Sequence, residues 1–447
     1  MSDELLEIGD RIVAMSRAGE QVEVVVGRSR STEVRVYDGE VESLSSAESA
    51  GVGVRVVSGH RQGFAYAGSL DADVLADTLA DARDNAGFAT EDAFLGLADP
   101  DGVAVADLDL YREGLAALPT DRKIDLAAEL ERAVRAADPR ITGVDAADYA
   151  DALAEGCVVT STGIRTSSRE SSCYVSASCQ ATEGGDTQTG FGFSVGRLPE
   201  DLDVESAAAD AARRATRLLG ATKPASGRVT VVLDPFVTAQ LIAIIGSTFS
   251  GEAVLKGRSL FAERLGEEVA AGVVTLVDDP TNPLAYTAGQ TDGEGLASRR
   301  NALIDGGVLQ KFVHNAYSAR RAGTTSTANA VRGFKSTPGV GCRALALSPG
   351  SQSQAELLAA VGDGVLVASV SGLHSGVNPV SGDFSTGAEG LRITGGALGE
   401  PLREFTIAST LQRMLHDVIA VGSDTEWLPM SAAGVSLVIR DVTVSGA

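Results

Sequence analysis

Residues 227–257 constrain the fold most, because they join a strand, a long apolar helix and a polar helix end in one stretch. The β-branched run from 229 to 233 has the alternation of a strand. Asp234 and Pro235 then supply a helix N-cap and a proline at the first helical position. Between 236 and 249 apolar residues recur mostly at spacings of three and four, and others fill the opposite side. The stretch therefore predicts a strand that leads into a mostly buried helix, which runs on into the segment SGEAVLKG.

The amino-terminal half predicts helices around antiparallel strands. Helical periods over 3–17 and 71–87 flank a valine-rich alternation that breaks at Gly and Asp-Gly, the pattern of a meander of about four or five strands. A further helix is predicted over 121–138, followed by a second sheet from about 141. An amphipathic helix over 202–219, acidic early and basic late, completes this half.

A domain boundary is predicted at residue 224, where glycine, lysine and proline follow the last of these helices. Two domains also agree with a length of 447 residues. Residues 1–224 are expected to form a helix and antiparallel-sheet domain, with a middle sheet segment from about 120. Residues 225–447 are expected to form a β-rich domain around the buried helix, so the predicted fold class is α+β.

Charge and hydropathy exclude two kinds of partner. The chain carries 60 acidic against 37 basic residues, a formal charge of -23, and lacks the basic stripe that nucleic acid requires. No apolar run approaches the ~20 residues that cross a bilayer, and the first residues lack a signal-peptide pattern. We therefore expect a cytoplasmic protein with no nucleic-acid or membrane partner. The 4 cysteines form no CxxC pair and no cluster with the 4 histidines, which predicts reduced, structural cysteines.

Beyond residue 257 the sequence predicts a β-rich layer with short turns, and one of its loops carries two acidic candidates. Asp292 and Glu294 alternate with glycines. They are either metal or peptide ligands, or loop carboxylates that hydrogen-bond their own backbone.

The glycine-rich tract 369–390 predicts a loop whose backbone comes close to a peptide or to another part of the fold. Within it, His374, Asn378 and Asp383 are candidate substrate-binding residues. A helix over 406–415 and a closing strand are predicted to complete the chain.

The segment GEAVLK resembles the position of the HExxxH zinc motif in the TldD/PmbA family of metallopeptidases. Gly251 stands where the first histidine would be, Glu252 keeps the glutamate, and Lys256 replaces the second histidine. Glycine offers no ligand and an ammonium repels a cation, so this vestigial motif cannot hold zinc. The cysteine that the resemblance implies near 419–424 as a third ligand is also missing, and His416 is the remaining substitute close by.

Two longer phrases, SVSGLHSGVNPVSGDFSTGAEG and GVGVRVVSGHRQGFAY, extend the resemblance, and the first resembles the PmbA branch, also called TldE. The family acts on unfolded or flexible peptides, and a PmbA-type subunit pairs with a zinc-bearing TldD-type subunit. The resemblance thus implies a metallopeptidase-like domain over 225–447 in a non-catalytic subunit that binds no metal itself.

The resemblance further implies zinc in a TldD-type partner, and the assembly is either this hetero-oligomer or a homodimer. Two alternatives stay open. One is a self-sufficient metallopeptidase with atypical ligands. The other is a module that binds extended peptides at a strand edge without cleaving them.

Overall fold

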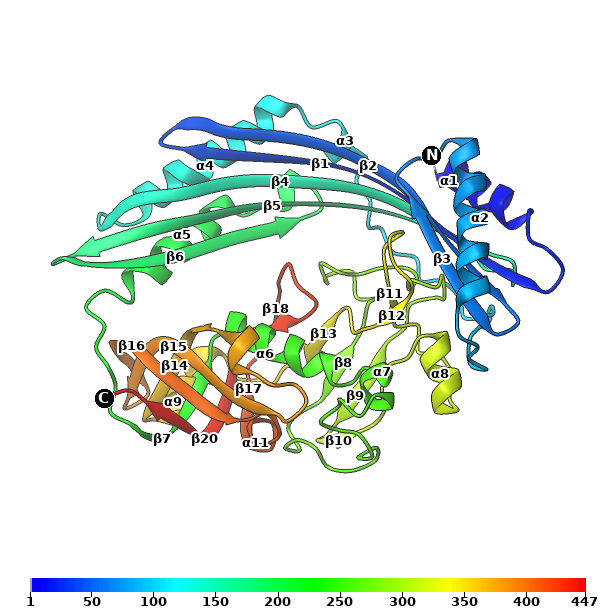
Figure 1. Ribbon diagram of the computed structural model, residues 1–447. Coiled ribbons are helices and arrows are strands. Elements are labelled where there is room, and N and C mark those ends of the chain that lie inside the picture. The colour runs from blue at the N-terminus through cyan, green and yellow to red at the C-terminus, as the bar shows by residue number, and fades with distance from the viewer. Residues whose placement is uncertain (1) are drawn as a thin grey trace.

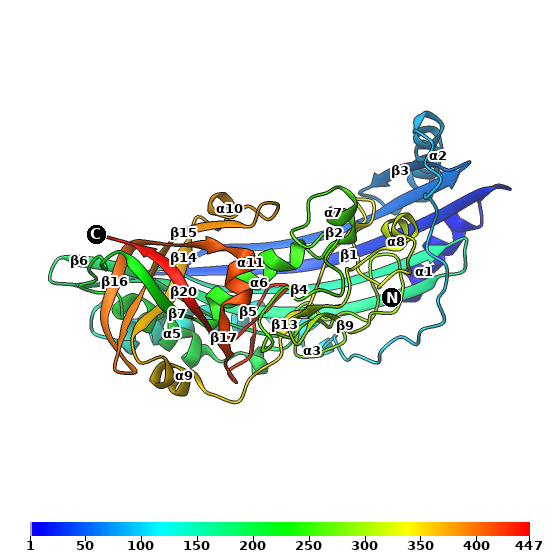
Figure 2. The ribbon, with the colours of Figure 1, turned by 90° about the horizontal axis from the view of Figure 1, so that it is seen from below.

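The computed structural model describes residues 2–447 (Figure 1). A six-stranded antiparallel sheet, here called the long sheet, arches over a carboxy-terminal part that comprises residues 227–447 (Figure 1). Figure 2 shows the carboxy-terminal part lying along the strands of the long sheet. The strand order is β3-β2-β1-β4-β5-β6, with β1 (Glu20–Tyr37), β2 (Glu40–Ser58), β3 (Arg61–Ala67), β4 (Ile141–Thr160), β5 (Arg165–Glu183) and β6 (Asp186–Gly196).

Two sequence predictions for the long sheet are wrong. Residues 20–67 form three long strands instead of four or five, and β4 to β6 extend the same sheet instead of forming a second one. β4 pairs with β1 in an antiparallel register that places Gly27 opposite Gly156, and Gly27 also lies opposite Gly51 of β2. Glycines that suggest turns in the sequence therefore lie inside strands, because another segment approaches the sheet closely there.

Helices cover one face of the long sheet only. Tyr149 and Val175 of the sheet pack with Leu130 of α4, and Val24 packs with Ile12 of α1. The four helices predicted in this half are confirmed, although the first ends earlier than expected. The helices of this half are α1 (Ser2–Val13), α2 (Ala72–Phe88), α3 (Glu113–Ala116), α4 (Thr120–Ala137) and α5 (Val204–Thr216), with a short 3-10 turn at Pro199–Asp201. The other, concave face is left for the carboxy-terminal part.

The carboxy-terminal part is built around a second six-stranded sheet and the predicted buried helix. Asp234 caps α6, since its carboxylate accepts the N–H of Phe236 at 3.2 Å, and Pro235 is the first helical residue. The predicted strand and buried helix are thus confirmed. The sheet order is β16-β15-β14-β7-β20-β17, and β16 also pairs with β20. Its elements are β7 (Gly227–Leu233), α6 (Pro235–Ser247), β14 (Gly364–Ser371), β15 (Asp383–Thr394), β16 (Ala397–Thr410), β17 (Val418–Val421) and β20 (Leu437–Ser445).

Short elements complete this part, and no helix within residues 2–447 is both long and apolar enough to cross a membrane. A four-stranded sheet has the order β10-β9-β8-β13, and two hairpins pair β11 with β12 and β18 with β19. The strands are β8 (Leu276–Asp278), β9 (Asn301–Asp305), β10 (Val308–Leu309), β11 (Ala330–Val331), β12 (Gly339–Val340), β13 (Leu345–Leu347), β18 (Glu426–Trp427) and β19 (Ala433–Gly434). The helices are α7 (Gly251–Leu255), α8 (Ala316–Ala322), α9 (Gln354–Val361), α10 (Leu373–Gly376) and α11 (Leu411–His416).

Two further predictions need correction. Residues 406–410 continue strand β16 instead of starting a helix, because they pair with both β15 and β20, and α11 begins only at Leu411. The tract 369–390 is not one loop. Its first residues end β14 and its last ones, from Asp383, form β15, where glycines permit close packing against the neighbouring strand.

The two parts of the chain meet where the turn between β11 and β12 presses on the concave face of the long sheet. The ring of Phe334 lies against glycines of two adjacent strands. A Cβ atom at Gly51 would lie 2.3 Å from Cε2 of that ring, and one at Gly53 would lie 2.1 Å from the Phe334 carbonyl oxygen. The glycines therefore form a socket, and any side chain there would push the hairpin away.

We expect Gly53→Ala to destabilise the protein by about 1–3 kcal/mol, because the new methyl group overlaps the backbone of Phe334. Gly143→Ala in β4 is the matched control, since nothing lies within 4 Å of a Cβ atom there. Urea unfolding followed by circular dichroism measures both. Equal unfolding free energies for the two variants would contradict the socket.

Candidate functional site

The segment after α6 does not continue that helix, which corrects the prediction for SGEAVLKG. α6 ends at Ser247, and the chain turns before α7 begins at Gly251. The N–H of Gly251 donates to the carbonyl of Val313 at 2.8 Å. Phe249, within the turn, is fully buried and stacks on Phe261 with ring centroids 5.0 Å apart. Core packing thus overrides the helical pattern and turns the vestigial motif away from the α6 axis.

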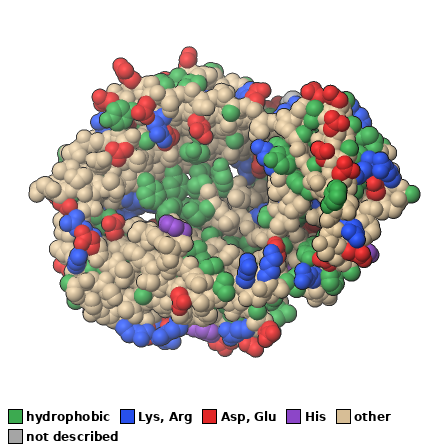
Figure 3. Space-filling model, in the orientation of Figure 1, with side chains coloured by type: hydrophobic (Ala, Val, Ile, Leu, Met, Phe, Trp, Pro, Cys, Tyr) green, Lys and Arg blue, Asp and Glu red, His purple; other side chains and the backbone are tan. Residues whose placement is uncertain are grey.

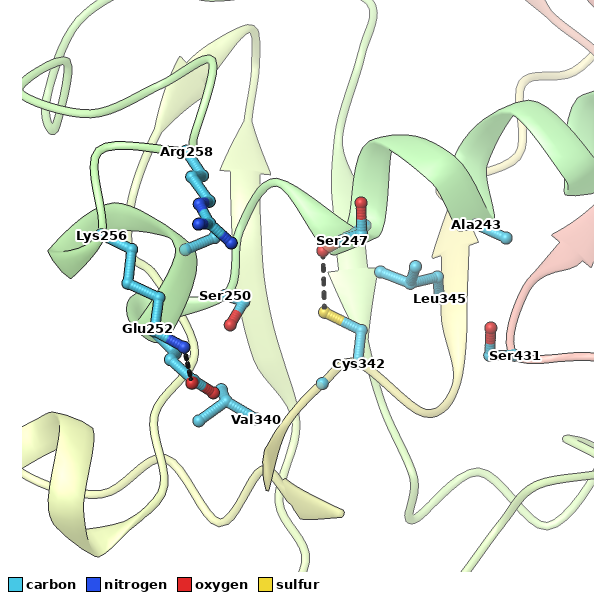
Figure 4. A pocket seen from close by; sticks show the side chains of 13 residues that line it. Ala243, Ser247, Ser250, Glu252, Lys256, Arg258, Val340, Cys342, Leu345 and Ser431 are labelled. Carbon is cyan, nitrogen blue, oxygen red and sulfur yellow. Dashed lines mark hydrogen bonds and ion pairs between the residues drawn. The ribbon is translucent and has the colours of Figure 1, made fainter. Parts of the chain in front are cut away.

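Glu252 and Lys256 form an ion pair at the i to i+4 spacing, between Glu252 Oε1 and Lys256 Nζ. Their side chains are 40% and 55% exposed, so the pair contributes only about 0.3–0.5 kcal/mol to stability. Both line a cleft of about 420 Å³ between the end of α6, α7 and strands β12 and β13, here called the α6–α7 cleft (Figure 4). Its other lining residues include Ser250, Arg258, Val340, Cys342, Leu345 and Ser431.

The imidazole of His314 fills the space beside Gly251. A Cβ atom at position 251 would lie 2.1 Å from Cε1 of that ring, far inside contact distance. His314 is buried, its Nδ1 lies 3.1 Å from the hydroxyl of Ser318, and burial lowers the pKa of the imidazole. In the sequence His314 is only one of 4 histidines. The N-cap pattern at Asn315 predicts the start of α8 just after His314, but nothing local in the sequence links His314 to position 251.

We predict that Gly251→Ala lowers stability by about 1–3 kcal/mol through this overlap, although alanine is the better helix former. In a His314→Ala background the same substitution is expected to be neutral or stabilising, because the obstructing ring is gone. Urea unfolding of the two single variants and the double variant gives the coupling energy. Additive effects would show that the ring does not exclude side chains at position 251.

Four charged side chains form a buried cluster where the hairpin β11–β12 meets the long sheet. Glu23 and Arg55 lie opposite each other on β1 and β2, and Glu294 and Arg332 come from the carboxy-terminal part. All four side chains are at most 3% exposed. Arg55 Nη2 lies 2.7 Å from Glu23 Oε2 and 3.6 Å from Glu294 Oε1, and Arg332 pairs with Glu23. Of these four residues, the sequence analysis names only Glu294. The pairing of Glu23 with Arg55 depends on the register between β1 and β2, which the sequence does not reveal.

The two acidic candidates of the loop after β8 have different surroundings. Asp292 accepts the N–H groups of Glu294 and Leu296 at 2.9 and 3.0 Å, and also that of Ala330 at 3.0 Å, as a loop carboxylate does. Glu294 accepts the N–H of Ala316 at 2.8 Å through Oε2, while its Oε1 has no hydrogen-bond partner within residues 2–447. Burial raises the pKa of Glu294 to about 7, against the opposing charge of Arg55 in the cluster.

The pKa of Glu294 is raised in the folded state, so the folded protein favours the protonated carboxyl. The stability that this protonated side chain contributes is fully present below about pH 4.5 and is lost as the pH rises through about 7. We expect Glu294→Gln, which keeps the shape without the charge, to remove this loss. The stability of the variant relative to the unmodified protein should then rise by roughly 3 kcal/mol between pH 4.5 and pH 8. Urea unfolding across this range is the measurement, and parallel curves would contradict the expectation.

Two of the candidate substrate-binding residues, His374 and Asn378, lie in the connection between β14 and β15, and the third, Asp383, is the first residue of β15. His374 is exposed on α10. Asn378 accepts the N–H groups of the two residues after Pro379, and Asp383 accepts the hydroxyl of Ser381. Within residues 2–447, none of these three candidates lines the α6–α7 cleft. Their role in peptide binding stays a prediction.

His416 ends α11 and is exposed, while Met414 and Leu415 before it are buried. All 4 cysteines are free thiols. Burial raises the pKa of Cys173 to about 12 and those of Cys157 and Cys179 to about 11, which keeps these three protonated and unreactive at neutral pH.

Comparison with known proteins places the chain in a family. Sequence models described as domain 1, the central domain and the C-terminal domain of the PmbA/TldA metallopeptidases match residues 22–86, 113–219 and 226–446. These three matches together cover most of the sequence, and they follow one another in the family's domain order. The chain belongs to the TldD/PmbA metallopeptidase family, as its motifs predict.

Relatives from both branches of the family are similar over most of their length. The metalloprotease PmbA of Escherichia coli O157:H7 is 27% identical over 427 residues, which cover 95% of this chain and 92% of the relative. A metalloprotease TldD homolog of Haemophilus influenzae is 26% identical and covers 92% of this chain and 89% of its own length. The crystal structure of TldE from Thermococcus kodakarensis superposes with a TM-score of 0.90 at 23% identity over 99% of both chains, which shows the same fold.

Zinc does not fit the residues that this chain presents at the motif. Glycine stands at position 251 against a neutral histidine ring, and the carboxylate of Glu252 is paired with the ammonium of Lys256. Within residues 2–447, no group of three or more His, Cys, Asp and Glu side chains converges so as to hold a metal ion. In the α6–α7 cleft, the ammonium of Lys256 thus stands where a zinc site has a ligand.

Proposed function

We propose that the chain is a PmbA/TldE-like, non-catalytic subunit of a metallopeptidase that degrades or trims unfolded or flexible peptides. The observation that carries the proposal is the pair of substitutions at the motif, glycine packed under His314 at position 251 and an ion-paired lysine at position 256. In this proposal a TldD-type paralogue supplies zinc and the cleavage step. A cytoplasmic location stays a prediction.

A hollow between the two parts of the chain supports a role in holding peptides. It has a volume of about 550 Å³ and is lined by β1, β4 and β5 of the long sheet and by loops of the carboxy-terminal part. Figure 3 shows an opening there with apolar side chains inside. The sheet wall carries small side chains, among them Ser29, Ala154 and Gly156, which leave room for an extended backbone. We propose that this hollow forms one wall of a peptide chamber, with His374, Asn378 and Asp383 as candidate contacts.

We further propose two domains, residues 1–224 and 225–447, and assembly with a TldD-type paralogue or, failing that, with a second copy of the chain. The carboxy-terminal part is proposed to carry the interface. The chain has a net charge of -23, so an apolar contact area is needed to overcome repulsion between like charges.

A second candidate function is peptide binding without a catalytic partner. β2 pairs with β3 only from Val52 onward, so residues 40–51 are paired with β1 alone and leave a free strand edge. An extended peptide can add to such an edge through backbone hydrogen bonds. In this case a peptide would bind to the isolated chain, and no paralogue would be required.

Zinc content and co-expression test the proposal together. The purified chain is expected to contain almost no zinc and to show no peptidase activity. Co-expression with a TldD-type paralogue is expected to give one stable complex that cleaves flexible peptides, and disruption of the paralogue's HExxxH motif abolishes that cleavage. A submicromolar zinc site in the isolated chain that Glu252→Gln or His416→Ala removes would overturn the proposal and favour a self-sufficient peptidase.

A further inference from the structure

The α6–α7 cleft contains more positive than negative charge. Its charged lining residues are Glu252, Lys256 and Arg258, two cations against one carboxylate. Glu252 pairs with Lys256, whereas Arg258 is exposed at the mouth of the cleft and its guanidinium pairs with no acidic side chain within residues 2–447 (Figure 4). The cleft is thus locally positive, although the whole chain has a net charge of -23. The net positive charge of the lining favours a ligand with an anionic group.

The two walls of the cleft differ in polarity. Figure 4 shows Lys256, Arg258 and Ser250 on one side, and Cys342, Leu345 and Ser431 on the other. Ala243 lies on the second side as well, whereas Val340 lies beside Glu252. A volume of about 420 Å³ suits one or two amino-acid residues. The arrangement therefore matches a carboxylate attached to an apolar side chain, with the anion toward Arg258 and the side chain toward Leu345.

We propose that the α6–α7 cleft binds the terminal carboxylate of an extended peptide. Arg258 donates two N–H groups to that carboxylate, and Lys256 adds a second positive charge whose position Glu252 fixes. The choice of a peptide as ligand rests on the proposed function, whereas the charge of the cleft does not. All residues named for this site belong to this chain, so the isolated full-length chain can be tested.

Fluorescence anisotropy with two labelled peptides tests this proposal on the full-length chain. The peptides share the sequence Gly-Ala-Ser-Ala-Val-Leu with fluorescein at the amino terminus, and one ends in a carboxylate and the other in a carboxamide. The carboxylate peptide is expected to bind at least about fivefold more tightly. Arg258→Gln should remove that difference by weakening the carboxylate peptide alone. Arg264→Gln is the matched control, because Arg264 lies outside the cleft lining and pairs with Glu267.

Two further variants test the sign of the charge effect. Glu252→Gln removes the one carboxylate of the cleft and is expected to tighten binding of the carboxylate peptide about twofold or more, whereas Lys256→Gln weakens it. A cation site would respond in the opposite direction. Circular dichroism confirms that each variant is folded.

Equal binding of the two peptides overturns the proposal, as does weaker binding of the carboxylate peptide by Glu252→Gln. Binding of neither peptide at millimolar concentration also overturns it. Inorganic phosphate that binds as tightly as the carboxylate peptide would show a general anion site and would overturn the assignment to a peptide terminus. None of these outcomes affects the zinc and co-expression test, so failure of this proposal and failure of the proposed function are distinguishable.

Discussion

The contact between the β11–β12 hairpin and the concave face of the long sheet determines how the two parts of this chain are placed. Phe334 enters a socket that only glycine leaves open, and Arg332 brings a positive charge to Glu23 inside the junction. Buried charges are costly unless they are paired, so the cluster tolerates one relative position of the two parts and penalises others. The contact therefore fixes the relative position of the two parts more than it increases the free energy of unfolding.

The same junction is connected to the vestigial motif by a short series of contacts. Glu294 of the charged cluster accepts the N–H of Ala316 at the start of α8, and His314 stands two residues before it. The ring of His314 in turn closes the space over Gly251. Placement of the long sheet, the start of α8 and the shape of the α6–α7 cleft thus depend on one another, although they lie far apart in the sequence.

Sequence patterns were sufficient where the signal is local and insufficient where it is not. The N-cap at Asp234 and the apolar period after it predict α6 correctly, because capping and burial act within a few residues. Strand pairing depends on distant partners, so β4 to β6 could not be assigned to the long sheet from their own residues. The motif could be judged from Gly251 and Lys256, but His314, whose ring decides the space there, has no local signal that links it to position 251.

The packing of His314 on Gly251 has a consequence for how such a chain can change over evolutionary time. A histidine introduced at position 251 meets a ring that already fills the site, so this substitution is harmful by itself. Removal of the ring first leaves a cavity, although the hydroxyl of Ser318 keeps its hydrogen bonds to the backbone of Asn315. Each single substitution is disfavoured in either order, so the residues at positions 251 and 314 constrain each other's replacement.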